Sequence, residues 1–206
     1  PAMSNQVVPT KGNLLATKKS LELARTGFEL LDRKRNILIR EMMALIDRAN
    51  AIQDKIDKTY EEAYAALQMA NITLGICDEL SKTVPVDNGL NVAYRSDMGV
   101  EIPMVSLEKS PTSVVPFGLY STNTMLDRAY LKFGDVKALT AELAEVENSV
   151  YRLADSIKKT QKRANALKNI MIPRFETTVK FITDALEEKD REEFSRLKVI
   201  KAQKSS

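Results

Sequence analysis

The chain has 206 residues, of which 29% are charged, and its 31 basic and 28 acidic residues leave a formal net charge of +3. This small balance does not imply a nucleic-acid partner, and the absence of histidine removes the commonest general base and metal ligand. Tryptophan is absent and aromatic residues make up 6% of the chain, which is few for a broad globular core.

The first residues carry little structural signal. Pro1 and Ala2 before Met3 are interpreted as a cloning remnant, and residues 1–12 as an N-terminal tail. Cys77 is the only cysteine, so no disulfide can form within the chain, and it is interpreted as a small apolar residue. No apolar run of about 18 residues occurs, which predicts no transmembrane helix, and no signal peptide is recognised.

Residues 13–76 are predicted to form one long helix. Apolar side chains recur there at alternating steps of three and four residues, which keeps one stripe facing a partner in a left-handed supercoil. Arg35 and Thr59 interrupt this stripe. We expect Arg35 to lie where the seam is open or covered by a partner. The seam residues predicted for this helix are Leu31, Leu38, Leu45, Ile52 and Ile56.

Residues 77–123 break the helical pattern and are predicted to be a loop region with a short β-hairpin. The stretches 91–95 and 100–105 are strand-like, and residues 96–99 between them suit a turn. Pro103 fits an edge strand or a strand end. Met98 and Met104 could form a soft docking surface, although packing is the more ordinary role of a methionine.

Residues 124–199 are predicted to form a second long helix, followed by a flexible tail at 200–206. The same stripe starts at Ala129 and includes Phe181, and Arg174 is a charged exception for which we also expect an open or covered seam. The seam residues predicted for this helix are Leu143, Val150, Leu153, Ile157 and Leu167.

Two local signals concern the ends and the continuity of this second helix. Thr124 with Asp127, or Ser121 with Thr124, could cap its start. Pro173 lies inside the periodic pattern. It is expected to kink the helix or weaken one turn, because proline lacks a donor and crowds the carbonyl four residues back.

Two amphipathic helices of matching length on one chain can bury their stripes against each other. The predicted fold is therefore all-α: a long antiparallel two-helix coiled coil with the hairpin and loops inserted between the helices. Each helix would be on the order of 90 to 110 Å long. A parallel homodimer of each helix is the rival arrangement, disfavoured because a partner of matching length lies on the same chain. Such a rod offers no concave pocket for a substrate.

No pattern of residues points to chemistry. The phosphate-binding and dinucleotide-binding glycine motifs and Cys/His zinc clusters are absent. The acidic run at 187–193 is interleaved with basic residues, which favours a solvated, ion-paired face over a metal or carboxylate site. The basic residues near the start, Lys11, Lys18, Lys19 and Arg25, could bind phosphate or an anionic surface, but a solvated face is again the default. We predict no catalytic residue, metal, cofactor or small-molecule substrate.

Several stretches resemble the D subunit of V/A-type ATPases. Residues 9–15 (PTKGNLL), 18–27 (KKSLELARTG) and 30–38 (LLDRKRNIL) are similar to the start of that family. Residues 163–167 (RANAL), 172–174 (IPR) and 186–198 (LEEKDREEFSRLK) are similar to its more specific C-terminal blocks. The chain departs at Lys168, where the family usually has glutamate, at a position off the stripe. The resemblance covers nearly the whole chain apart from the loop region.

The resemblance implies a non-catalytic central rotor stalk on the cytoplasmic side of a membrane, attached to it peripherally and without insertion. Its implied partners are the F subunit, the catalytic A and B subunits around the paired helix ends, and the C (d-type) subunit of the membrane ring. Such a stalk couples ion transport, of hydrogen or sodium ions, to ATP synthesis or to ATP hydrolysis. The alternatives are a coiled-coil adaptor or tether unrelated to ATPases, and an enzyme. The residues expected to touch the A/B head are Thr10, Lys11, Asn13, Leu14, Lys18, Arg191, Arg196 and Lys198.

Overall fold

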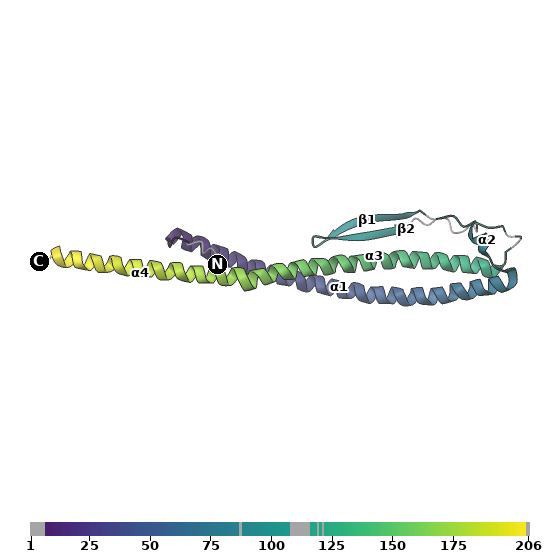
Figure 1. The fold of residues 1–206 in the computed structure, drawn as a ribbon, viewed down its shortest axis with the longest axis horizontal. Helices are drawn as coiled ribbons and strands as arrows, with labels where there is room; N and C mark the ends of the chain where they lie inside the picture. Colours follow the sequence, from purple (N-terminus) through teal and green to yellow (C-terminus); the bar gives the residue numbers. More distant parts are fainter. Residues whose placement is uncertain (1–6, 87, 108–115, 119, 121, 205–206) are drawn as a thin grey trace. The chain divides into compact units, whose positions relative to one another are not determined.

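The computed structural model describes residues 7–86, 88–107, 116–118, 120 and 122–204. The chain divides into a terminal unit, Pro1–Ile37 with Ile157–Ser206, and a middle unit, Leu38–Ser156. The predicted fold class, a helical pair with a hairpin inserted between the helices, is confirmed (Figure 1). In chain order the elements are α1 (Lys11–Leu74), α2 (Asp78–Ser81), β1 (Leu90–Asp97), β2 (Val100–Leu107), α3 (Thr124–Ala166), the π-helical turn η2 (Leu167–Met171) and α4 (Ile172–Lys204).

Residues next to α1 explain where this helix begins and where it ends. The hydroxyl of Thr10 accepts a hydrogen bond of 3.2 Å from the main-chain N–H of Asn13, so Thr10 caps the helix. The helix ends at Leu74, because Gly75 takes a left-handed conformation with φ of 79° that terminates helices. Its N–H donates to the carbonyl of Asn71 at 3.0 Å. The structure thus places α1 at 11–74, against the predicted 13–76.

The start of α3 is capped by Asn123, which the sequence pattern did not single out. The side-chain oxygen of Asn123 accepts a hydrogen bond of 2.9 Å from the N–H of Leu126. The predicted cap of Thr124 with Asp127 is therefore wrong: Thr124 is already the first helical residue, so the capping position falls on Asn123. The other predicted cap used Ser121, which lies outside the described residues.

In the middle unit, α1 and α3 run antiparallel. Two ion pairs show this direction: Arg48 of α1 pairs with Glu142 of α3, and Glu62, further along α1, pairs with Lys132, earlier on α3. Between these pairs lies an apolar core that buries two isoleucines of α1 and Val146 of α3. The members of this core are Ile52, Ile56 and Val146, with Leu45, Ala49, Leu139, Leu143 and Val150 packed around them.

The Glu62–Lys132 ion pair gives a measurable titration. The ammonium group of Lys132 lies 2.6 Å from the Glu62 carboxylate, and its hydrogen bond, then its charge, hold the pKa of Glu62 below the ordinary value. A depressed folded-state pKa means that the pair stabilises the fold above the unfolded-state pKa of this carboxyl. That stabilisation is lost as the pH falls through the folded-state value.

We expect a carbon-13 NMR titration to show a Glu62 midpoint below the ordinary value of a glutamate carboxyl. Lys132→Met should raise this midpoint most of the way to the ordinary value, leaving the weaker influence of Arg128. A Glu62 midpoint that ignores the Lys132 substitution would contradict this assignment.

In the terminal unit, α1 packs against the end of α3 and against α4, again antiparallel. Arg25 pairs with Glu176 of α4 at 2.6 Å. Arg35 is half-buried and donates to the side-chain oxygen of Gln161 at 2.7 Å, and its guanidinium lies 3.0 Å from the carboxylate of Asp32. The charged interruption of the α1 stripe therefore lies in a polar section of the seam, and Arg174, the interruption on α4, is exposed.

Pro173 is accompanied by a widened turn just before it. The N–H of Ile172 donates to the carbonyl of Leu167, five residues back, as in a π-helix. The wide turn adds one residue to the helix without advancing the stripe, so the buried positions beyond it shift by one. Phe181 is 56% exposed, whereas Ile182 is fully buried at 0%. The prediction that Phe181 lies in the seam is wrong for this reason.

The second long helix reaches Lys204, beyond the predicted end at 199. The residues from 200 onward, predicted to be a flexible tail, are helical as far as Lys204. Ile200, Lys201, Ala202 and Gln203 continue the helix without glycine or proline, and Lys201 and Lys204 lie in the last turn, where positive charge interacts favourably with the helix dipole.

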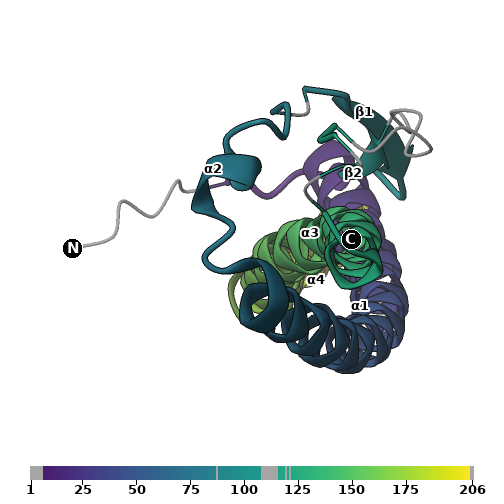
Figure 2. The ribbon, with the colours of Figure 1, turned by 90° about the vertical axis from the view of Figure 1, so that its right-hand side faces the viewer.

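The hairpin pairs β1 with β2 antiparallel, from Leu90 opposite Leu107 to Asp97 opposite Val100. The two turn residues, Met98 and Gly99, have φ of 50° and 75°, as the favoured two-residue hairpin turn requires. The end-on view places the hairpin and α2 outside the helical pair rather than within it (Figure 2). The short helix α2 lies in the predicted loop region, where no helix was expected.

Candidate functional site

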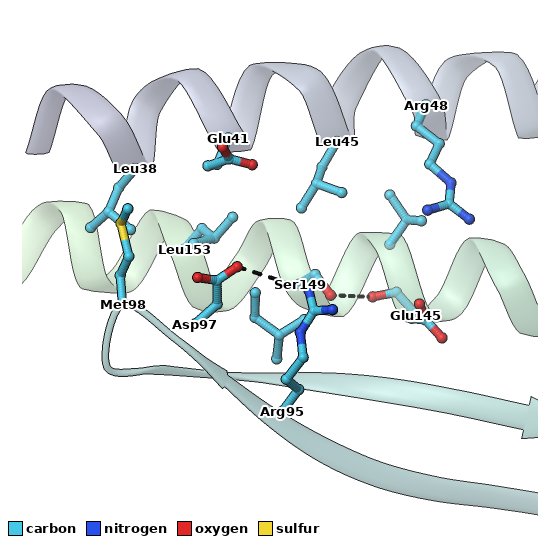
Figure 3. Close-up of a pocket in the computed structure, with 12 residues that line it drawn as sticks. Leu38, Glu41, Leu45, Arg48, Arg95, Asp97, Met98, Glu145, Ser149 and Leu153 are labelled. Atoms are coloured by element: carbon cyan, nitrogen blue, oxygen red, sulfur yellow. Dashed lines mark hydrogen bonds and ion pairs between the residues drawn. The ribbon is translucent and has the colours of Figure 1, made fainter. Parts of the chain in front are cut away.

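A cavity of about 120 Å³ lies under the tip of the hairpin, within the middle unit. Arg95, Asp97 and Met98 of the tip face Leu38 of α1 and Leu153 of α3 across it (Figure 3). It is smaller than ordinary ligand sites, which run from about 300 Å³ upward. Its charged groups also have neighbours of their own, because Arg95 lies 3.8 Å from Asp97. The cavity is therefore too small to act as a substrate site.

Metal binding and membrane crossing find no support in the described part of the chain. No group of three or more acidic, cysteine or histidine side chains there could hold a metal ion. None of the described helices combines the length and the apolar composition that crossing a membrane needs. The remaining candidates for function are surfaces.

The predicted head-contacting residues at the start of α1 lie on and around its first turns. Thr10, Lys11 and Lys18 are exposed, and Asn13 and Leu14 are half-buried. The side-chain amide of Asn13 donates to the carbonyl of Val8 at 2.8 Å, and Thr10 caps the helix. Two of these five residues thus organise the entry into α1, so substituting them would disturb structure as well as surface.

The predicted head-contacting residues on α4 are all exposed: Arg191, Arg196 and Lys198. Arg191 lies 3.7 Å from Glu187, and Arg196 lies 3.9 Å from Glu192, in each case one helical turn away. Exposed pairs of this kind contribute little to stability, typically about 0.3 to 0.5 kcal/mol. The structure brings these residues and those of the α1 start into one unit.

Four large apolar residues of the last turns of α4, not predicted from the sequence as surface residues, are also exposed. The exposed fraction is 70% for Phe194 and 64% for Leu197, and Val199 and Ile200 lie beside them. They have no partner in the described chain, because the pairing of Arg25 with Glu176 brings Lys11, the start of α1, opposite residues near 190. The sequence contained a signal for this exposure, because the C-terminal helical pattern is longer than the N-terminal one and its last turns therefore have no helix opposite them.

A second set of exposed apolar side chains lies on α1 in the same unit. Leu15, Leu23 and Leu30 recur about every seven or eight residues, so they share one helix face, and that face is not the buried one. On η2 and α4, Ile170 and Phe181 are exposed as well. An apolar helix face left in solvent is suited to contact with a partner protein.

A third apolar surface lies in the middle unit, around the end of α1 and the loops that follow it. Ile76 is 91% exposed, and Ile72, Val86 and Tyr120 project into solvent as well. A small core of Ala70, Phe117 and Leu126 packs at this end of α1 and α3. No sequence pattern had indicated a function for this region.

The predicted seam residues fall into two groups by burial. Leu38, Ile52, Ile56 and Leu153 are buried. The half-buried ones are Leu31, Leu45, Leu143, Val150, Ile157 and Leu167. Met98 and Met104, the possible docking methionines, are both exposed.

The chain is similar to a set of known proteins over most of its length. A family described as the ATP synthase D subunit matches residues 13–202. The V-type ATP synthase D subunit of Thermotoga neapolitana is 46% identical over 197 residues, covering 95% of this chain and 97% of that protein. The A-type ATP synthase D subunit of Pyrococcus abyssi is 37% identical, covering 96% and 94%. The corresponding protein of Thermococcus kodakarensis is 38% identical, covering 95% and 94%.

Proposed function

Because the chain belongs to the ATP synthase D subunit family, we propose that it is the central rotor shaft of a V/A-type rotary ATPase. In this proposal it carries no catalytic site and transmits torque between a catalytic head and a membrane ring. Its partners are the F subunit, the A and B subunits of the head, and the C (d-type) subunit of the ring. It works on the cytoplasmic side of the membrane as a peripheral part of the complex.

The observation that carries this proposal is the unpartnered apolar end of α4. Phe194, Leu197, Val199 and Ile200 would remain in water if the chain acted alone. The charged groups around them, Arg191, Arg196 and Lys198 with their acidic neighbours, form a mixed-charge surface. A helix end that is apolar and surrounded by mixed charges can rotate inside the head without binding one orientation too strongly.

Coupling then follows from asymmetry. A single helix end inside a head with three catalytic interfaces touches each interface differently, so turning it changes which interface is held closed. This is coupling by differential contact: the shaft shifts an equilibrium only as far as its contacts with the two states differ. The exposed leucines of α1, Leu15, Leu23 and Leu30, extend the same contact surface further along the terminal unit.

The apolar surface of the middle unit is assigned to the ring side. Ile72, Ile76, Val86 and Tyr120 lie around the end of α1 and on the loops after it, and loops adapt to a docking partner more readily than a helix face does. In this proposal they contact the C (d-type) subunit. The buried core of Ile52, Ile56 and Val146 supplies resistance to torsion within the middle unit.

Reconstitution tests the proposal against its alternatives. The chain should copurify with the F subunit and restore ATP hydrolysis coupled to rotation when added to an A/B head. The same head and F without the chain are the control. An adaptor or tether unrelated to ATPases would neither bind F nor restore activity. An enzyme would bind nucleotide in isolation, whereas the shaft should bind none by calorimetry.

A further inference from the structure

One of the two edges of the hairpin, that of β2, contacts the helices. Asp97 and Val100 close the two-residue turn, so they form a hydrogen-bonded pair, and the pairs alternate from there along the ladder. The alternation leaves Glu101, Pro103 and Val105 of β2 with their main-chain groups pointing away from β1.

At each of these outward positions on β2, one main-chain group is either bound or absent. The carbonyl of Glu101 accepts a hydrogen bond of 3.2 Å from the Arg152 guanidinium. Pro103 has no N–H to satisfy. The N–H of Val105 donates to the Glu145 carboxylate at 2.6 Å. The β2 edge is therefore docked on α3, and β2 is the strand nearer the helices (Figures 1 and 3).

The outer edge of β1 has no such arrangement. By the same alternation, Val92, Tyr94 and Ser96 direct their N–H and C=O groups away from β2. Within the described part of the chain, none of these three amides or carbonyls has a hydrogen-bond partner. The Tyr94 ring does lie against Arg152, 5.1 Å from its guanidinium carbon, so β1 is held in place with this edge open.

Open strand edges are normally protected. Proteins place lysine, proline or a covering element there, because unpaired main-chain groups recruit other strands. This chain protects β2 with Pro103 and α3, yet β1 (LNVAYRSD) contains neither lysine nor proline and is exposed along its whole length. An edge left open in this way in a folded chain is suited to being covered in the assembled complex.

We propose that β1 accepts an additional β-strand from another subunit, by main-chain hydrogen bonds to Val92, Tyr94 and Ser96. The partner is an extended segment, uncharged and apolar at alternate positions. We expect the partner segment to be uncharged because residues 90–94 of β1 carry no charged side chain to pair with it. The uncharged part of β1 ends at the exposed Arg95–Asp97 ion pair near the hairpin tip. The choice of another subunit over a second copy rests on the proposed function, because one head holds one shaft.

Glu145 and Arg152 are the positioning residues of this site. Neither touches the β1 edge with a hydrogen bond, but together they fix the β2 edge on α3 and so turn the β1 edge outward. Their side chains are half-buried, one on each side of Ser149 along the same face of α3.

Residue-resolved hydrogen exchange tests the proposal, comparing the isolated chain with the assembled ATPase complex. Strand addition predicts a period of two along β1. The amides of Val92, Tyr94 and Ser96 should exchange rapidly in the isolated chain and about tenfold or more slowly in the complex. The amides of Ala93 and Arg95 belong to the hairpin ladder and should be slow in both.

A matched pair of variants isolates the main-chain contact. Val92→Pro removes one outward N–H without removing a ladder hydrogen bond, as Pro103 already does on β2. Val92→Thr keeps that N–H and the β-branched shape. In complexes carrying Val92→Pro, the slowing at Tyr94 and Ser96 should fall at least severalfold, and Val92→Thr should retain it. Unchanged protection of Ala93 and Arg95 would show that the hairpin is intact in both variants.

Four results would overturn the proposal. Unchanged exchange at Val92, Tyr94 and Ser96 in a fully assembled complex would mean that the edge stays open. Uniform slowing of odd and even residues would indicate side-chain cover rather than an added strand. Slowing in the isolated chain that grows with its concentration would identify a second copy as the occupant. Retention of the slowing in Val92→Pro with an intact ladder would remove the main-chain contact. Failure of the chain to enter the complex at all is a separate result, which counts against the proposed function first.

Discussion

Deletion of residues 190–206 is expected to uncouple ATP hydrolysis from ion transport while leaving the F subunit bound. The deletion should not unfold the chain, because the described residues from 191 to 204 are all exposed. It removes four large apolar side chains, each of which stabilises a contact by roughly 1.5 to 3 kcal/mol when fully buried. Loss of even one such contact is expected to change the equilibrium between the states of the head that the shaft holds by about tenfold.

The measurement is the number of ions moved per ATP hydrolysed in reconstituted vesicles, with F retention followed by copurification. Two multiple-substitution variants separate the contributions to the effect. Replacing Phe194, Leu197, Val199 and Ile200 by serine should reproduce most of the deletion. Replacing Arg191, Arg196 and Lys198 by glutamine should have the smaller effect. Loss of F from the deleted chain would show that the helix ends had been assigned to the wrong partner.

Ile182→Ala is expected to lower the unfolding free energy of the isolated chain by about 2 to 5 kcal/mol, the usual cost of emptying a buried isoleucine site. Its neighbour provides the control. Phe181→Ala removes a larger side chain but an exposed one, and should change stability by less than about 0.5 kcal/mol. Urea unfolding followed by circular dichroism gives both values.

The comparison of these two variants decides between two registers of α4. Uninterrupted four-three periodicity places Phe181 in the seam, whereas the wide turn at Leu167–Met171 places Ile182 there. A larger loss from Phe181→Ala than from Ile182→Ala would restore the uninterrupted register. It would also mean that Pro173 is accommodated without an extra residue in the turn.

Residue type and spacing were sufficient where one physical effect dominated. Leu38, Ile52 and Leu153 are buried where the stripe placed them, because burial of apolar area is the dominant driving force of folding and the stripe recurs with helical period. The hairpin was predictable because proline and glycine interrupt the helical pattern and two strand-like runs, 91–95 and 100–105, lie on either side of a turn signal.

The remaining features depended on effects that periodicity does not contain. Pro173 predicts a disturbed turn, because proline has no N–H to donate. A helix can accommodate this with a kink or with an inserted residue, and only the insertion moves Phe181 out of the seam. The cap at Asn123 depended on locating the first helical residue, which sequence places only to within a few positions. The exposure of Phe194 depended on where the opposite helix begins, a property of a distant segment.

A helix pair lined with leucine and alanine can slip lengthwise by one heptad, because each such side chain fits the next hole almost as well. Arg35 removes that freedom in the terminal unit. Its guanidinium is matched to the oxygen of Gln161, and a slip of one heptad would set this half-buried cation opposite Ala154 or Lys168 instead. The polar pair thus fixes the axial register of the two helices in the terminal unit.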